Sequence, residues 1–420
     1  MNFSPELRFA QSIVRANKFS SDGHTLFKWV GTHHKVIDDQ ELEKMAWEYL
    51  VETDGEKVTP RLAASAAKAA ILHAEQFSQQ GKGTVIPVRN GYIHIGQRGE
   101  VTMNPHDPKA GLTYCLAVDY KLSARAERFE NFISEAIPDS QTLGFLQEYA
   151  GYTLLPDCRH EIAAWLIGPG GNGKSSFANV MQALHEKPVS MSLDGLDGFK
   201  LSSLLGASLV YVDETPRKIN EERLKTLISG GAIEIDRKYR DPITIRPTAK
   251  WIVSGNALPA LSDHSMGFWR RWVIFPFTVK PASIRPLLAE SIIEEELAGV
   301  LNWALTGLVR LLKRGCFPAL SSLMVAAKEA GKRETDSVKG WMDDIEPEGV
   351  ERAEYGVAKD IAYQHYHRWS LRNGFKSVSS EKFWSRIKTL LPVLTEKRVR
   401  ISGKQVRMVG LCHPEFREKF

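Results

Sequence analysis

The ten residues IGPGGNGKSS, 167–176, constrain this chain more than any other stretch of its sequence. They contain the spacing Gly168-x-x-x-x-Gly173-Lys174-Ser175, which is the full phosphate-loop pattern. The strand-like run AAWLI precedes the loop, and the helix-like stretch SSFANVMQALHE follows it. Such glycines let backbone N–H groups point at phosphate oxygens, while the next helix presents the positive end of its dipole. This context favours a nucleotide site over a simple Gly-rich turn.

Each residue type in the loop has a chemical purpose. Lys174 is expected to neutralise the β- and γ-phosphates of ATP, and Ser175 to offer its hydroxyl to Mg²⁺. The residues expected to hold ATP are Gly168, Gly170, Gly171, Asn172, Gly173, Lys174, Ser175 and Ser176.

About 40 residues later the apolar run SLVYV ends in Asp213-Glu214. A buried strand delivers these acids to the edge of a sheet, beside the phosphates. We expect Asp213 to hold Mg²⁺, directly or through water, and Glu214 to polarise the attacking water. The alternative is a strand that ends in two solvated acids.

Two later apolar runs also end or begin at polar side chains. WIVSGN ends at Asn256, which could orient the attacking water or sense the γ-phosphate; the alternative is a turn-forming residue.

GFWRRWVIFPF places Arg270 and Arg271 before a strand. A guanidinium aimed at a phosphoryl transition state raises the rate by orders of magnitude, although surface salt bridges are the other interpretation.

Residues 233–245, IEIDRKYRDPITI, predict a small hairpin with a basic tip. The predicted DNA contacts at this tip are Arg237, Lys238 and Tyr239, since cations bind phosphates and a ring stacks on a base or sugar. The hairpin lies between the strand that ends at Asp213 and the strand that ends at Asn256. It could therefore move with the state of the nucleotide. A solvated charged loop is the alternative.

Composition sets the frame for these motifs. The chain has 420 residues, 43% hydrophobic and 25% charged, which is typical of a globular protein with two or three domains. The net charge is only +5, so DNA binding must rest on local clusters. The four cysteines are scattered, and the pair His33-His34 has no partner at ligand spacing, so no zinc module is predicted. No signal peptide or run of 18 apolar residues appears, which predicts a cytoplasmic protein without a membrane partner.

The order of patterns predicts a multidomain α/β fold. Residues 1–84 are mostly helical in pattern, and 85–158 combine strand-like pieces with two amphipathic helices. Apolar runs alternate with helices over 159–280, as in a buried, mainly parallel sheet. Residues 281–345 return to helix. Residues 346–420 show helices followed by a hairpin near Ser402-Gly403, which predicts a C-terminal winged helix.

The last segment carries a local excess of positive charge. From Lys376 to Arg407 there are nine Lys or Arg residues and two acids. Cations on the helix SSEKFWSRIKTLL would point outward, and the hairpin adds more. The predicted contacts to duplex DNA are Lys382, Arg386, Arg400 and Lys404. A solvated basic face or a partner-docking surface is the alternative.

These motifs, from the phosphate loop through Asp213-Glu214, SGGAIEIDRKYRDPITI and Asn256 to Arg271, resemble superfamily III helicases in order and spacing. The hairpin is similar to the pre-sensor hairpin of papillomavirus replicative helicases, with Lys238 and Tyr239 at the DNA-touching places; Tyr instead of His is a departure. Residues 85–158 look like the collar of poxvirus-type primase–helicases of phages and plasmids. Residues 1–84 are too few for a primase–polymerase domain, so a stand-alone helicase or a fragment is expected.

The resemblance implies an AAA+-type ATPase core that uses ATP and Mg²⁺. It implies a hexameric ring that draws single-stranded DNA through its channel at forks, 3′ to 5′, during replication of a mobile element. Arg271 would then act as the arginine finger on a neighbour's nucleotide, and a separate primase or polymerase is a possible partner. The alternatives are an origin-binding initiator switched by ATP and an ATP-dependent remodeller of protein or RNA.

Overall fold

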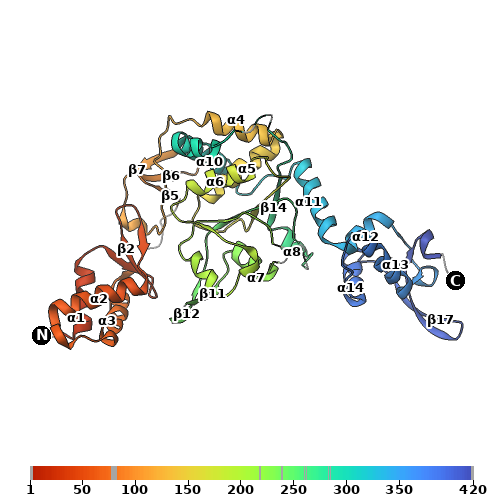
Figure 1. Cartoon of the computed structure of the whole chain (residues 1–420), viewed down its shortest axis with the longest axis horizontal. Helices are drawn as coiled ribbons and strands as arrows, with labels where there is room; N and C mark the ends of the chain where they lie inside the picture. The colour runs from red at the N-terminus through yellow and green to blue at the C-terminus, as the bar shows by residue number, and fades with distance from the viewer. Residues whose placement is uncertain are drawn as a thin grey trace.

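The computed structural model describes residues 3–76, 83–216, 219–237, 240–259, 261, 263–281, 283 and 285–417. Over these residues the chain is a multidomain α/β protein whose largest sheet is parallel. Figure 1 shows an N-terminal unit at one end, a central unit around the parallel sheet and a C-terminal unit at the other end. None of the described helices is both long and apolar enough to cross a membrane.

Three helices make most of the N-terminal unit: α1 (Pro5–Arg15), α2 (Asp39–Asp54) and α3 (Pro60–His73). Each begins at a side-chain cap that accepts a backbone N–H, from Ser4, Asp38 and Thr59. The predicted helices are confirmed, but a four-stranded sheet was missed: β1 (Phe19–Ser21), β2 (Leu26–Trp29), β3 (His34–Val36) and β4 (Glu75–Gln76). These strands are too short for alternation to show in the sequence.

The next segment opens with an antiparallel sheet of β5 (Thr84–Val88), β6 (Gly91–Ile95) and β7 (Val101–Asn104). The first turn is Arg89-Asn90, because Val88 pairs with Gly91, which is the first residue of β6. The two predicted amphipathic helices are also present, as α4 (Glu127–Ala136) and α5 (Ser140–Thr153).

Five parallel strands form the central sheet in the order β14-β8-β13-β10-β9. They are β8 (Ala163–Ile167), β9 (Pro188–Ser190), β10 (Leu209–Val212), β13 (Lys250–Gly255) and β14 (Trp272–Pro276). Side chains of β8 alternate between two cores: Ala164 and Leu166 pack into one, Ala163 and Trp165 into the other. Because both faces are buried, the strands read as continuous apolar runs.

Helix α5 approaches α10 (Leu297–Arg314) closely because each helix has a glycine at the contact. A Cβ atom on Gly151 would lie 2.5 Å from the carbonyl oxygen of Ala304. A Cβ on Gly307 would overlap the carbonyl oxygen of Gln147. This packing covers the core that lies beneath the phosphate loop.

The hairpin predicted at 233–245 is confirmed as β11 (Ile233–Arg237) and β12 (Arg240–Ile245), with Ile233 opposite Ile245 and Ile235 opposite Ile243. Ile233 and Ile235 are buried in the core beside α7 (Glu221–Ile228). In Figure 1 the hairpin and α7 lie on the opposite side of the sheet from α4, α5 and α10.

The chain leaves the central unit through α9 (Leu288–Glu295), α10 and α11 (Ser322–Thr335). The C-terminal unit contains α12 (Ser337–Ile345), α13 (Lys359–Arg372) and α14 (Ser380–Leu390), followed by β17 (Glu396–Ile401) and β18 (Lys404–Val409). Strand β16 (Val357–Ala358) completes a three-stranded sheet with them, and β15 (Glu348–Gly349) pairs with β19 (Leu411–Cys412). The predicted turn at Ser402-Gly403 is confirmed, with φ of +48° and +82° at the two residues.

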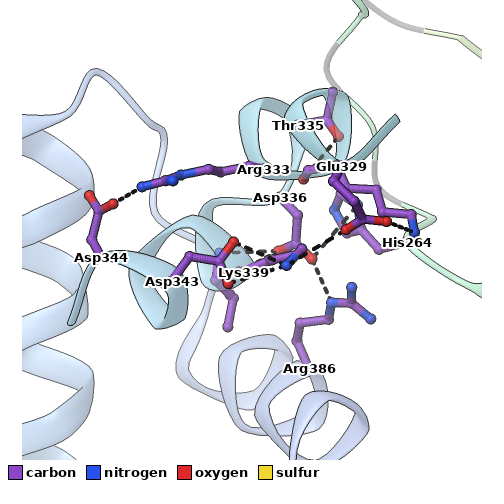
Figure 2. A network of polar contacts seen from close by, with 11 residues as sticks. His264, Glu329, Arg333, Thr335, Asp336, Lys339, Asp343, Asp344 and Arg386 are labelled. Atoms are coloured by element: carbon purple, nitrogen blue, oxygen red, sulfur yellow. Dashed lines mark hydrogen bonds and ion pairs between the residues drawn. The ribbon is translucent and has the colours of Figure 1, made fainter. Parts of the chain in front are cut away.

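The buried carboxylate of Asp336 lies where the central and C-terminal units meet (Figure 2). It caps α12 by accepting the N–H groups of Val338 and Lys339, both at 3.1 Å. Arg386 of α14 donates to its Oδ2 at 2.6 Å, and His264 Nδ1 lies 4.0 Å from the same oxygen. His264 belongs to the segment between β13 and β14, so this one carboxylate contacts groups from both units.

Candidate nucleotide site and basic surfaces

The phosphate loop lies where β8 ends and α6 (Lys174–Ala183) begins. Gly171 and Gly173 have φ of +79° and +91°, in the left-handed region that favours glycine. Gly168 has no room for a side chain, because a Cβ atom there would overlap the carbonyl oxygen of Phe277. The loop therefore wraps the N-terminus of α6, whose unpaired N–H groups make a suitable site for an anion.

Beside this loop is a cavity of about 1050 Å³, at the upper end of the size range of ligand pockets. It brings together five segments that are far apart in the sequence: the end of α4, the phosphate loop, the end of β10, the end of β13 and the segment after β14. Of the predicted nucleotide residues, those that line it are Gly170, Gly171, Asn172, Gly173, Lys174, Ser175, Ser176, Asp213, Glu214 and Asn256. Gly168 lies at the base of the loop, outside this lining.

The ammonium group of Lys174 is buried and donates to oxygens of its own loop. Its acceptors are the carbonyl oxygens of Gly168 at 2.6 Å and Pro169 at 2.9 Å, and Oδ1 of Asn172 at 3.1 Å. Asn172 is itself anchored, because its Nδ2 donates to the carbonyl oxygen of Phe277. Burial lowers the pKa of Lys174.

The carboxylates of Asp213 and Glu214 follow β10 directly and face the cavity. Tyr211, which the sequence reasoning missed, donates from its hydroxyl to Oδ1 of Asp213 at 2.6 Å. Burial first, and the bond to Asp213 second, raise the pKa of Tyr211 to about 12. Thr215 Oγ1 donates to the carbonyl oxygen of Ser254 at 3.2 Å, which joins the ends of β10 and β13. These contacts hold the acids beside Asn256.

Arg271 lies at the other end of the strands. Its carbonyl oxygen accepts the N–H of Ala163, so it stands where β8 begins, whereas the phosphate loop follows the end of β8. Its guanidinium donates to Ser229 Oγ at 2.8 Å and to the Gly267 carbonyl oxygen at 2.5 Å, and it lies 3.4 Å from Glu161. Burial, with Arg270 nearby, lowers its pKa. Arg271 is therefore not part of the cavity of its own chain.

A second arginine, which the sequence reasoning did not single out, does line the cavity. Arg285 follows β14 and forms an ion pair with Glu135 of α4, with 2.5 Å between Nη2 and Oε2. Both side chains belong to the cavity wall. No local motif surrounds Arg285, so only the folded chain shows its position.

The predicted DNA contacts fall in two places. Lys238, Tyr239 and the side chain of Arg237 lie outside the described residues. In the C-terminal unit, Lys382, Arg400 and Lys404 are exposed, and Arg400 lies opposite Gln405 in the β17–β18 pair. Arg386 does not point outward as expected, because Asp336 binds its guanidinium and the side chain is only 19% exposed.

Comparison with known proteins gives partial matches. A family model described as "Family of unknown function (DUF5906)" matches residues 166–271, which include the phosphate loop, the acids and the hairpin. The protein named "Putative helicase 022R" of Frog virus 3 (isolate Goorha) is 28% identical over 206 residues, 44% of this chain. The match spans only 19% of that relative's length.

Two solved structures of the NrS-1 C-terminal region share the fold. One, an apo A form, has a TM-score of 0.52 at 14% identity and covers 96% of this chain and 99% of its own. The second, residues 305–718 in the A form, has a TM-score of 0.51 at 14% identity, over 97% of this chain and 99% of its own. The chain thus has an α/β fold similar to the NrS-1 C-terminal region and partial sequence similarity to a viral protein that carries a helicase name.

Proposed function

We propose that this chain is an ATP-dependent DNA helicase of superfamily III that acts in the replication of a phage, virus or other mobile element. The observation that carries the proposal is the single cavity shared by the phosphate loop, Asp213, Glu214 and Asn256. Ligands of open parallel sheets bind at the carboxyl ends of the strands, and this cavity lies at those ends. The helicase name of the Frog virus 3 relative supports the reaction class.

In this mechanism Lys174 exchanges the carbonyl oxygens of its loop for the β- and γ-phosphate oxygens of ATP. Ser175 and Asp213 offer a hydroxyl and a carboxylate to the same cavity, and these hard oxygen ligands suit Mg²⁺. The ion would neutralise charge on the phosphates. Glu214 polarises the attacking water, and Asn256 orients it.

We further propose a ring, in which each ATP lies between two subunits. The position of Arg271 at the far end of the strands supports this assembly, because its guanidinium is remote from its own cavity. It would serve the cavity of the next subunit as an arginine finger. Six subunits, the 3′-to-5′ direction and the AAA+ assignment rest on the resemblance of the motifs.

The hairpin of β11 and β12 would couple this chemistry to DNA. Its base is packed in the core beside β13, whose end lines the cavity, so changes there can be transmitted to the tip. Lys238 and Tyr239 at the tip would hold one strand in the channel. The C-terminal unit would act as a winged helix on duplex DNA, with Lys382, Arg400 and Lys404 at phosphates.

Strand displacement on a forked DNA tests the proposal. Lys174→Ala should abolish ATP turnover, whereas Lys200→Ala, an exposed lysine outside the cavity, should not change it. Lys238→Ala should keep basal turnover and lose unwinding and stimulation by DNA. If Lys238→Ala unwinds at the wild-type rate, the role of the hairpin is wrong. A mixture of Arg271→Ala and Glu214→Ala subunits tests whether the finger acts between subunits.

The second candidate is an origin-binding initiator in which ATP controls assembly. The exposed cations of the β17–β18 hairpin favour it, since they suit duplex DNA. Such a protein would bind duplex origin DNA and fail to displace a strand. A remodeller of protein or RNA would instead show ATP turnover that single-stranded DNA does not change.

A further inference from the structure

Three side chains that commonly bind metal ions meet where the N-terminal unit contacts the central unit. They are His33 in the β2–β3 turn, Cys115 in the segment after β7, and Glu186 just after α6. One ligand atom from each lies within 4.8 Å of the other two. His33 and Cys115 are 5% and 3% exposed, whereas the side chain of Glu186 is about half exposed.

Backbone contacts hold these three segments together. Leu116 and His185 form an antiparallel bridge, so Cys115 and Glu186 are the next facing pair along it. The Ala117 N–H donates to the Leu184 carbonyl oxygen at 2.8 Å. Two other hydrogen bonds hold the turn that contains His33. The N–H of His34 donates to the carbonyl oxygen of Leu112 at 2.7 Å. The hydroxyl of Tyr92 donates to the carbonyl oxygen of Thr32 at 2.9 Å. The ligand atoms thus belong to anchored backbone.

The ring of His33 is oriented for coordination. Its Nδ1 lies 2.9 Å from Oγ1 of Thr32, and its Nε2 lies 3.7 Å from Oε2 of Glu186. In the tautomer whose Nδ1–H donates to Thr32, Nε2 presents its lone pair toward the carboxylate. Metal-binding histidines are usually held in this way, by a hydrogen bond from the other ring nitrogen.

The charges also fit a divalent cation. A thiol must lose its proton to bind a metal ion, and Cys115 Sγ lies within 4.8 Å of the Glu186 carboxylate. A cation would displace that proton, and its two positive charges would balance the thiolate and the carboxylate. Buried charges are tolerated when they are paired in this way. Arg89 and Lys35 add positive potential here, which the two anionic ligands oppose.

We propose that His33 Nε2, Cys115 Sγ and the Glu186 carboxylate bind one thiophilic divalent cation, with Zn²⁺ as the best match. Zinc binds nitrogen, sulfur and oxygen at about 2.0–2.3 Å, which places tetrahedral ligands about 3.5 Å apart. The distance of 3.7 Å between His33 Nε2 and Glu186 Oε2 is close to this spacing. Water would occupy the fourth position.

Such an ion would join the N-terminal unit to the central unit at the end of α6. That helix begins at the phosphate loop, so the joint is mechanically connected to the nucleotide cavity. The proposal does not depend on the helicase assignment, because binding of the ion requires neither ATP nor DNA.

Cobalt binding tests the site, because Co²⁺ replaces Zn²⁺ and reports a thiolate ligand through a charge-transfer band in the near ultraviolet. Untagged, metal-free full chain is titrated with CoCl₂, and ZnSO₄ is then added. We expect one Co²⁺ per chain, a thiolate band and displacement by Zn²⁺. Cys115→Ser should abolish the band, whereas Cys316→Ser, an exposed cysteine elsewhere, should keep it.

Glu186→Gln provides a variant that spares the buried residues. Loss of a supporting partner of a metal ligand costs about 10- to 100-fold in affinity, so loss of a direct ligand should weaken Co²⁺ binding at least tenfold. Zn²⁺ should also raise the melting temperature of the wild type and not of Glu186→Gln. The proposal is overturned if the wild type shows no thiolate band, if Cys115→Ser retains it, or if Glu186→Gln binds Co²⁺ as tightly as wild type.

Discussion

Replacing Asp336 by Asn isolates the charge that joins α12 to α14 in the C-terminal unit (Figure 2). Asn is as good an N-cap residue as Asp, so Asp336→Asn keeps an acceptor for the N–H groups of Val338 and Lys339. What the variant loses is the carboxylate that binds the guanidinium of Arg386. The two side chains are 3% and 19% exposed, so Arg386 would be left partly buried without its counter-ion.

The size of the effect follows from this burial. Breaking a buried ion pair costs about 3–5 kcal/mol, and losing a hydrogen bond to a charged group costs about 1.5–3 kcal/mol. Because Arg386 keeps some access to water, we expect Asp336→Asn to lower the free energy of local opening of the C-terminal unit by about 2–3 kcal/mol. That free energy corresponds to a roughly 30- to 150-fold rise in the opening equilibrium.

Hydrogen exchange of the amides in α12 and α14 measures this opening directly. Arg333→Met is the matched control, because it breaks the ion pair between Arg333 and Asp344, whose side chains are 52% and 33% exposed. An exposed pair of this kind contributes under about 1 kcal/mol. If Asp336→Asn leaves exchange in α12 and α14 no faster than Arg333→Met does, the role of the carboxylate in holding α14 against α12 is refuted.

Three further outcomes are expected. Gly173→Ala should lower the free energy of unfolding by at least about 1–2 kcal/mol, because φ is +91° and the new Cβ atom would lie 2.6 Å from a ring carbon of Phe132. Gly170→Ala is the control, because its Cβ atom would meet no atom within 4 Å. Melting curves and nucleotide titration compare the two variants. Burial lowers the pKa of Lys250 from 10.5 to about 8, so between these values the native state binds fewer protons than the unfolded state. The free energy of unfolding should therefore rise by roughly 2–3 kcal/mol between pH 8 and 10. Denaturant unfolding measures this rise, which Lys250→Met should lack. Neutralising Arg400 and Lys404 together should lower the slope of log affinity for duplex DNA against log salt by about 2; an unchanged slope would show that neither residue contacts phosphate.

Local patterns in the sequence predicted most of the elements and most of the candidate nucleotide site. The phosphate loop is ten contiguous residues between a strand and a helix, so its backbone geometry follows from spacing alone. Asp213 and Asn256 could be placed together because each follows a buried apolar run, and such runs end at one edge of a parallel sheet. The two hairpins followed from apolar alternation and turn residues.

Only the tertiary structure shows which charged or ligating side chains pair with one another and which enter a site. Arg386 has the same spacing as its outward-pointing neighbours on α14, yet it meets Asp336, 50 residues earlier. Arg285 enters the cavity beside Glu135, 150 residues away, and His33, Cys115 and Glu186 come from three separate segments. Contacts between residues so distant leave no periodicity in the chain, because their meeting depends on how whole elements pack and not on the conformation of either segment.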